Sequence, residues 1–280
     1  MDIFEAIILG IVQGLAEFLP ISSSGHLALL QHFFGIDGSN VLTFTVLLHF
    51  GTLVAVFVCF WGDIWALIKE FFALLADIFT GKGVQLRKND TRKLLFMIIV
   101  ATIPAGVVGV LFDKWIESVF TSIIVVGVCL IVTGTILFVA ERISGAERGI
   151  DRANFRNAFV VGLFQAVALL PGISRSGSTI VGGLFLGFTR ELAVRFAFLI
   201  SIPSVLGATV LEVPDAMNAG LAGDLLLPTA LGVIAAAASG YFAIKAMIRL
   251  VTGKKLFVFS VYTWAVGAIV VAGCLAGVLK

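Results

Sequence analysis

Long apolar runs alternate with short polar connections along this chain, and the runs have the lengths of membrane-spanning helices. A helix needs about 20 apolar residues to cross the hydrocarbon core of a bilayer. Six runs meet this requirement, so we predict spans at about 41–61, 94–112, 120–140, 191–212, 225–248 and 257–279.

Two other apolar stretches are each divided by a break that is rich in Pro, Ser and Gly. No half of either stretch is long enough for a confident crossing, so each stretch predicts a re-entrant helix–loop–helix hairpin. One hairpin would consist of 3–19 and 26–36, the other of 157–170 and 178–189. The pattern therefore predicts an all-α integral membrane protein with about six transmembrane helices plus two re-entrant hairpins.

The two divided stretches are similar to each other. Gln13–His26 reads QGLAEFLPISSSGH and Gln165–Ser178 reads QAVALLPGISRSGS, at an offset of 152 residues. Both contain S-x-S-G at the same place, and further matches follow on either side without a gap, which apolar composition alone does not explain. We therefore predict a single membrane domain over 1–280, formed by repeat one, about 1–140, and repeat two, about 153–280.

Composition agrees with this interpretation, because 60% of the residues are hydrophobic and 13% are charged, which is outside the soluble globular range. The start of the chain, MDIFEAIILG, lacks the basic flank of a cleavable signal peptide. Cys59, Cys129 and Cys274 lie inside apolar runs, so we expect buried thiols without a disulfide or metal role. We expect contacts with membrane lipids and no nucleic-acid partner.

Basic residues orient the predicted spans. The connections rich in Lys and Arg are predicted to be cytoplasmic, and they are 62–93, 141–156 and 249–256. The connections 113–119 and 213–224, which hold one basic residue and none, are predicted to be external. Trp65–Thr80 is expected to form an amphipathic helix on the inner surface. The two hairpins then enter from opposite faces as an inverted-topology repeat, with their tips approaching each other inside the membrane.

The tips share a pattern that suits an anion. We expect the second half-helix of each hairpin to begin near His26 and near Ser178, with Ser24 or Ser176 as its cap. The free N–H groups and positive dipole ends of two facing helix starts form a site suited to phosphate. The predicted phosphate-binding residues are Ser22, Ser24, Gly25, Ser174, Ser176, Gly177 and Thr179.

The positions at which the two tips differ carry the predicted chemistry. Glu17 aligns with Leu169, Ser23 with Arg175, and His26 with a serine. One tip would thus supply a carboxylate, a hydroxyl and an imidazole, and the other a guanidinium, as phosphoryl transfer requires. We predict Glu17, Ser23, His26 and Arg175 as catalytic residues, with either Ser23 or His26 as the nucleophile.

Two further expectations concern a metal and a second histidine. Gln13 and Glu17 are four residues apart on one helix face, so they could hold a divalent ion, Mg²⁺ or Ca²⁺, against phosphate oxygens. His49 lies inside the span 41–61, where an interhelical hydrogen bond is a better interpretation than catalysis.

The two motifs, QGLAEFLPISSSGH at Gln13–His26 and PGISRSGST at Pro171–Thr179, together resemble those of the undecaprenyl-diphosphate phosphatases, also called bacitracin resistance proteins. The resemblance covers essentially the whole chain. It implies an enzyme of the bacterial cytoplasmic membrane that removes the terminal phosphate of a C55 isoprenoid diphosphate, with a divalent metal and an active site open to the outer face. Gln13 stands where some members have a glutamate, which leaves Glu17 to carry more of the metal site.

Two other functions remain open at this point. Inverted hairpins around an anion site also suit a prenyl-phosphate flippase or a phosphate-type transporter. A different lipid phosphate, such as a shorter prenyl diphosphate, is a further candidate substrate. A transporter has no need of Ser23 and His26 as a reactive pair, which favours the enzyme. Whether the chain forms a homodimer is also left open.

Overall fold

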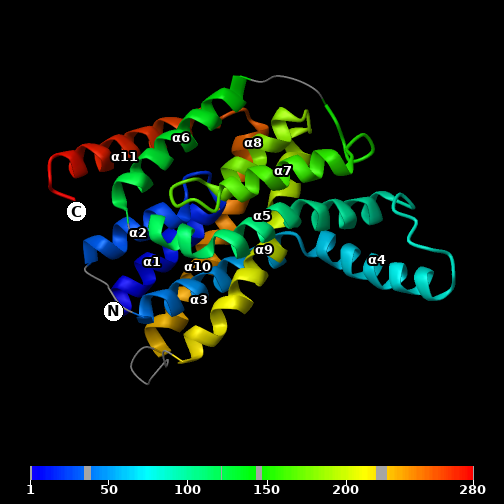
Figure 1. The fold of residues 1–280 in the computed structure, drawn as a ribbon, viewed down its shortest axis with the longest axis horizontal. Helices are drawn as coiled ribbons and strands as arrows, with labels where there is room; N and C mark the ends of the chain where they lie inside the picture. Colours follow the sequence, from blue (N-terminus) through cyan, green and yellow to red (C-terminus); the bar gives the residue numbers. More distant parts are fainter. Residues whose placement is uncertain (1, 35–38, 121, 143–146, 219–225, 280) are drawn as a thin grey trace.

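The prediction of an all-α protein is confirmed. The computed structural model describes residues 2–34, 39–120, 122–142, 147–218 and 226–279, and within them the only β-structure is an isolated bridge between Arg148 and Phe188. The helices (Figure 1) are α1 Ile3–Phe18, α2 Ser23–Phe34, α3 Ser39–Cys59, α4 Trp61–Phe79, α5 Asp90–Phe120, α6 Ile123–Arg142, α7 Phe155–Val167, α8 Arg175–Phe185, α9 Arg190–Asn218, α10 Leu226–Thr252 and α11 Phe257–Leu275.

Several helices are long and apolar enough to cross a membrane. By length and composition, four described segments qualify, namely Asp90–Phe112 of α5, and α6, α10 and α11. The bent pair Phe44–Cys59 and Trp61–Phe79 is a fifth candidate, and α9 covers the remaining expected span, 191–212, as one helix. The chain is therefore a multi-pass membrane protein. The predicted connections 141–156 and 213–224 fall partly outside the described residues.

The helix α4 leaves the direction of α3 by 86° and packs alongside the first part of α5, as the cyan helix of Figure 1 shows. Arg92 at the start of α5 is fully buried, and its guanidinium binds Glu70 at 2.6 Å and Asp77 at 2.7 Å. Lys88 also binds Asp77 at 2.7 Å. Hydrogen bonds from Lys88 and Arg92 hold the pKa of Asp77 below its usual range. These ion pairs fix α4, the predicted surface helix, against the start of α5 and the residues just before it.

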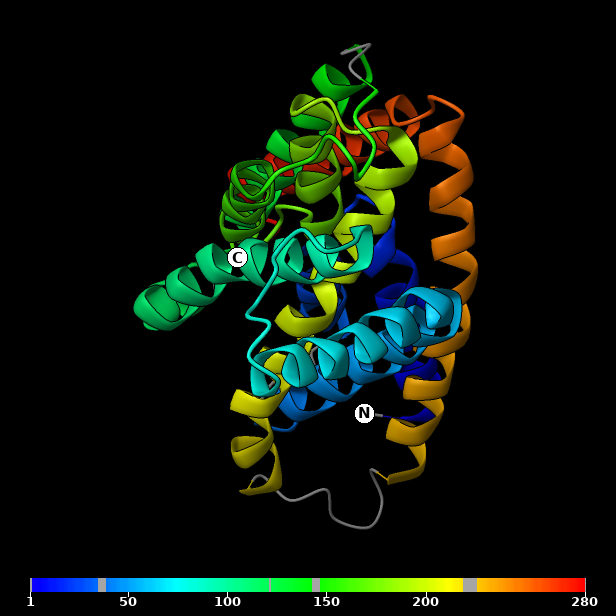
Figure 2. The ribbon, with the colours of Figure 1, turned by 90° about the vertical axis from the view of Figure 1, so that its right-hand side faces the viewer.

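Two close helix crossings hold the hairpins in the bundle. The half-helix α1 packs along α10, the long orange helix at the side of Figure 2, and α7 packs along α5. At Gly10 of α1 an added Cβ would lie 2.2 Å from the carbonyl oxygen of Gly232, and at Gly162 of α7 it would lie 2.4 Å from that of Ala101. Gly10 and Gly162 are separated by the same 152 residues as the two motifs. Only glycine allows these backbones to approach so closely.

The tips of the two hairpins touch each other in a reciprocal way. A Cβ added to Gly25 would lie 3.3 Å from the Cα of Gly172, and one added to Gly177 would lie 3.1 Å from the Cβ of Pro20. At the offset of 152, Gly25 corresponds to Gly177 and Pro20 to Gly172. Gly172 has φ 90°, a left-handed conformation in which a side chain would be strained. Each S-x-S-G glycine therefore rests on the turn of the other hairpin.

Candidate active site

The second half-helix of each hairpin begins earlier than we predicted. The helices α2 and α8 begin at Ser23 and Arg175, and not near His26 and Ser178. The first serine of S-x-S-G is the residue that caps the free N–H groups, because Ser174 Oγ accepts from Gly177 N at 3.1 Å. The prediction of Ser24 and Ser176 as caps was therefore wrong. Ser23 and Arg175 consequently occupy the first helical position, directly at the positive ends of the two helix dipoles.

The first hairpin repeats this arrangement with small differences. Ser22 Oγ accepts from Gly25 N at 3.3 Å, and Ser22 has φ 71°, a left-handed conformation that is unusual for serine. Its hydroxyl lies 3.3 Å from that of Ser24, and the hydroxyls of Ser174 and Ser176 are separated by the same distance. The two S-x-S-G segments thus adopt matching hydrogen-bond patterns at the point where their hairpins meet.

Two of the predicted phosphate-binding hydroxyls, those of Ser176 and Thr179, are bound to backbone carbonyls. Ser176 Oγ donates to the Leu19 carbonyl of the other hairpin at 3.3 Å, and Thr179 Oγ1 donates to the Arg175 carbonyl at 2.8 Å. Thr133 of α6 was not found by sequence reasoning. It donates to the Gly172 carbonyl at 2.9 Å and accepts from Ser174 N at 3.1 Å. These hydroxyls shape the tip loops and leave the backbone N–H groups and Arg175 as the groups best placed to meet an anion.

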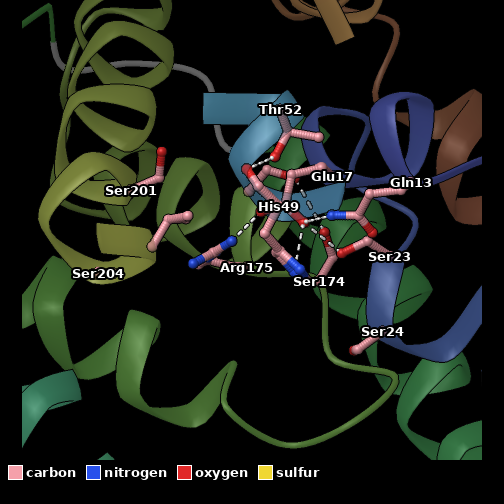
Figure 3. A network of polar contacts seen from close by, with 12 residues as sticks. Gln13, Glu17, Ser23, Ser24, His49, Thr52, Ser174, Arg175, Ser201 and Ser204 are labelled. Carbon is pink, nitrogen blue, oxygen red and sulfur yellow. Dashed lines mark hydrogen bonds and ion pairs between the residues drawn. The ribbon is translucent and has the colours of Figure 1, made fainter. Parts of the chain in front are cut away.

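Glu17 lies at the centre of a polar network that joins both hairpins, and Figure 3 shows these side chains pointing toward it. It is 8% exposed, and its carboxylate forms an ion pair with the guanidinium of Arg175 from the other hairpin. Ser23 Oγ donates to Glu17 Oε2 at 2.6 Å, and Gln13 Nε2 donates to the same oxygen at 3.1 Å. The structure thus brings together Gln13, Glu17, Ser23 and Arg175, as the sequence predicted.

His49 belongs to this network as well, although we expected it only to make an interhelical hydrogen bond. Its Nδ1 lies 2.8 Å from the Thr45 carbonyl of its own helix, and its Nε2 lies 3.7 Å from Glu17 Oε2. Ser201, its counterpart at the offset of 152, lies with Ser204 on α9, on the opposite side of Arg175 in Figure 3. In this view α3 and α9 lie on either side of Arg175.

His26 is separate from the Glu17 network. Its Nδ1 lies 2.8 Å from the Ser22 carbonyl, and its Nε2 lies 2.8 Å from the hydroxyl of Tyr262. The two rings are stacked, with their centroids 5.6 Å apart. Tyr262 is on α11, and no feature of the sequence connects it with the first hairpin. Of the four predicted catalytic residues, His26 alone makes no recorded contact with Glu17, Ser23 or Arg175.

The residues around Glu17 could hold a divalent ion that needs few ligands from the protein. Gln13 Oε1 is fully buried and has no hydrogen-bond partner in the described parts of the chain, so an oxygen ligand is free beside the Glu17 carboxylate. Among the described residues, however, no three His, Cys, Asp or Glu side chains come together as a metal cage. This set suits Mg²⁺, which takes one or two protein oxygens and the rest of its ligands from water and phosphate, better than Ca²⁺.

The fold and the site define a class of protein: a multi-pass membrane protein in which two re-entrant hairpins bring helix N-termini, a guanidinium and a carboxylate–serine pair together. The family described as bacitracin resistance protein BacA matches residues 6–269, and the chain belongs to this family.

The relatives agree. The undecaprenyl-diphosphatase of Alkaliphilus metalliredigens is 51% identical over 97% of this chain and 98% of its own length. That of Halothermothrix orenii is 42% identical over 99% of this chain and all of its own length. The undecaprenyl-diphosphatase of Methanosphaera stadtmanae is 41% identical, over 97% of this chain and 98% of its own.

Proposed function

We propose that this protein hydrolyses undecaprenyl diphosphate to undecaprenyl phosphate and inorganic phosphate, and so recycles the lipid carrier for cell-wall synthesis. The relatives support this substrate, because all three are undecaprenyl-diphosphatases and each matches this chain over nearly its whole length. The observation that supports the chemistry is the hydrogen bond of 2.6 Å from Ser23 to Glu17, beside the guanidinium of Arg175. A hydroxyl, a base and an anion clamp are the parts that phosphoryl transfer needs.

Arg175 would clamp the terminal phosphate of the substrate. Its Nη2 is the atom that binds Glu17, which leaves other N–H groups of the guanidinium available to phosphate oxygens. The N-terminus of α8, which begins at Arg175, and that of α2, which begins at Ser23, add backbone N–H groups and positive dipole ends. Together these groups would stabilise the negative charge on the transferring phosphoryl group.

Ser23 is the better candidate for the nucleophile. Its hydroxyl already donates to a carboxylate, whereas both ring nitrogens of His26 are bound elsewhere. In the first step Ser23 Oγ attacks the terminal phosphorus, the bond to the bridging oxygen breaks, undecaprenyl phosphate leaves, and Glu17 takes the serine proton. In the second step water attacks the phosphoserine, inorganic phosphate leaves, and the proton returns to Ser23 Oγ. His26 and Tyr262 would hold the first turn of α2 in position.

A divalent ion would bind at Glu17 and Gln13, and we propose Mg²⁺. When bound, it would neutralise charge on the phosphate oxygens. The chain itself supplies Glu17 as the carboxylate ligand and the unpartnered Gln13 Oε1 as a neutral one. Because Nη2 of Arg175 pairs with Glu17 in this structure, that pair would open when the ion binds Glu17, while the other N–H groups of the guanidinium meet the phosphate.

We also propose that the site opens to the outer face of the cytoplasmic membrane. The support is the distribution of Lys and Arg, which places 62–93, 141–156 and 249–256 inside. In Figure 1 both termini lie on the left, away from the α4–α5 connection on the right, as this orientation requires. A prenyl-phosphate flippase built on the same hairpins is the second candidate, and the Ser23–Glu17 pair favours the enzyme because transport needs no nucleophile.

The test is phosphate release from C55 diphosphate by the purified protein, with and without a chelator. Ser23→Ala is expected to lower kcat by about 10³-fold or more, and Arg175→Lys by about 10²-fold, because lysine cannot form the bidentate contact. Ser260→Ala is the control for removal of a serine hydroxyl elsewhere in the bundle, since Ser260 is buried in α11 and its hydroxyl donates to the Leu256 carbonyl at 3.5 Å. Full activity of Ser23→Ala would exclude Ser23 as the nucleophile, and full activity of Arg175→Lys would exclude the clamp.

A further inference from the structure

His49 meets the carboxylate of Glu17 with a ring nitrogen that has no proton to donate. Its Nδ1 lies 2.8 Å from the Thr45 carbonyl oxygen, and a carbonyl oxygen only accepts hydrogen bonds, so Nδ1 carries the ring proton. In the neutral imidazole Nε2 then presents a lone pair. This nitrogen lies 3.7 Å from Glu17 Oε2, which is also an acceptor. Two such groups repel each other unless a cation lies between them.

The distance between the two acceptors suits a metal ion better than a proton. A proton on Nε2 would draw the carboxylate into a hydrogen bond of about 2.7–3.2 Å, which is shorter than the 3.7 Å found. Two ligands that each lie about 2.1 Å from one ion are roughly 3–3.5 Å apart. The side chain of His49 is 28% exposed, so an ion that keeps water ligands can reach Nε2.

The contact between Nδ1 of His49 and the Thr45 carbonyl is also typical of a metal ligand. A histidine that binds a metal through one nitrogen usually donates the other ring N–H to a backbone carbonyl or a carboxylate, which fixes the tautomer and the direction of the ring. Here the carbonyl belongs to the preceding turn of α3, so the helix itself holds Nε2 in place.

The groups that could bind a cation belong to one repeat only. At the offset of 152, Glu17 corresponds to Leu169. His49 corresponds to Ser201 at the same offset. Repeat two supplies Arg175 instead, at the start of α8. A cation held by repeat one and a phosphate held by repeat two would therefore meet where the two repeats join.

We infer that His49 Nε2 is a ligand of the divalent ion, together with the Glu17 carboxylate and Gln13 Oε1. This inference rests on the proposed function, which places an ion at Glu17 and Gln13. It also assigns a selectivity to the site, because imidazole nitrogen suits transition ions, whereas Mg²⁺ and Ca²⁺ take oxygen ligands. Mg²⁺ would bind through the oxygens alone, and a transition ion such as Mn²⁺ would bind more tightly because His49 adds a nitrogen.

The test uses Mn²⁺, because this ion is paramagnetic and pulsed electron-spin resonance detects the nuclei of its ligands. The purified wild-type protein is expected to show a coupling of bound Mn²⁺ to an imidazole nitrogen. Incorporation of ¹⁵N-histidine should change that coupling, and this part of the test needs no substitution. His49→Gln should abolish the coupling and weaken Mn²⁺ binding about tenfold or more. Its affinity for Mg²⁺, measured by displacement of Mn²⁺, should change less than twofold.

His32→Gln is the control for removal of a histidine. His32 is exposed on α2, so this variant should keep the nitrogen coupling and both affinities. Absence of Mn²⁺ binding, bound Mn²⁺ without a nitrogen coupling, or a coupling that survives in His49→Gln would overturn the inference. Equal losses of Mn²⁺ and Mg²⁺ affinity in His49→Gln would also overturn it, because the substitution would then disturb the whole site.

Phosphate release from C55 diphosphate, measured separately in Mg²⁺, distinguishes failure of this inference from failure of the proposed function. Release by a wild-type protein that shows no nitrogen coupling would refute His49 as a ligand and leave the hydrolysis standing. A nitrogen coupling in a wild-type protein that releases no phosphate would support the ligand and refute the hydrolysis.

Discussion

Replacement of Gly10 by alanine is expected to separate α1 from α10 and to destabilise the protein. The added Cβ would lie 2.2 Å from the carbonyl oxygen of Gly232, whereas ordinary van der Waals contact begins at 3.4 Å. The two backbones would have to move apart by roughly 1 Å, since neither atom belongs to a side chain that can rotate away. Overpacking of this kind costs about 1–3 kcal/mol, and backbone-to-backbone contact places Gly10→Ala at the upper end.

Gly106→Ala provides the control for the intrinsic effect of the substitution. Gly106 is exposed within α5, and no atom of the described residues lies within 4 Å of the position of its added Cβ. Alanine there gains helix propensity of about 1 kcal/mol without any clash. The two variants should therefore differ by about 3 kcal/mol, which corresponds to a difference in melting midpoint of about 6–12 °C for a chain of this size.

The measurement is thermal unfolding of the purified protein in detergent, followed by phosphate release at a temperature at which both variants are folded. Glu17 lies two helical turns beyond Gly10 on α1, so a shift of the helix also moves the carboxylate relative to Arg175. A misplacement of about 1 Å can lower the rate up to 10²-fold. Equal midpoints for Gly10→Ala and Gly106→Ala would refute the close crossing of α1 and α10.

Three further predictions concern other parts of the molecule. Tyr262→Phe keeps the ring that stacks on His26 but removes its hydrogen bond, so phosphate release should fall by up to about tenfold, and an unchanged rate would show that this bond has no role. Because Lys88 and Arg92 hold the pKa of Asp77 below its usual range, this carboxylate stabilises the α4–α5 contact above about pH 4 and loses that effect as the pH falls further. Asp77→Asn should abolish this acid-dependent loss, measured as proteolysis of the α4–α5 connection between pH 3 and 7, and a profile like that of the wild type would contradict it. Gln13→Glu should lower the melting midpoint without metal, because two carboxylates then face each other, and millimolar Mg²⁺ should restore it; a midpoint insensitive to Mg²⁺ would argue against the metal site.

The positions of the hairpins could be predicted from the sequence because their breaks depend on local chemistry. Pro, Ser and Gly interrupt the apolar runs, and repetition of S-x-S-G at a fixed offset identified both tips. The helix starts were placed three residues too late, because Ser24 and Ser176 were taken as caps. A capping side chain binds the N–H group two or three residues further along the chain. The glycine N–H groups of S-x-S-G are therefore bound by the first serine of the motif, Ser22 or Ser174.

The partners that come from distant helices could not be predicted. His49 was visible as a polar residue in a membrane span, but its spacing gives no information about which neighbour its ring meets. Tyr262 is 236 residues from His26, and Thr133 contacts a loop 39 residues away. Such contacts follow from how the helices cross, and the crossings depend on close approaches such as those at Gly10 and Gly162. These approaches appear in the sequence only as two more glycines among 30.

The ion pair between Glu17 and Arg175 has a consequence for product release. A lone guanidinium in an apolar membrane interior is costly, so between turnovers the empty site is expected to return to the neutral pair. Inorganic phosphate bound to Arg175, as we propose, would therefore compete with a carboxylate that is tethered beside the guanidinium at high effective concentration. With the proposed clamp, the protein would carry its own displacing anion, and this should keep the affinity for free phosphate low even where free phosphate is abundant.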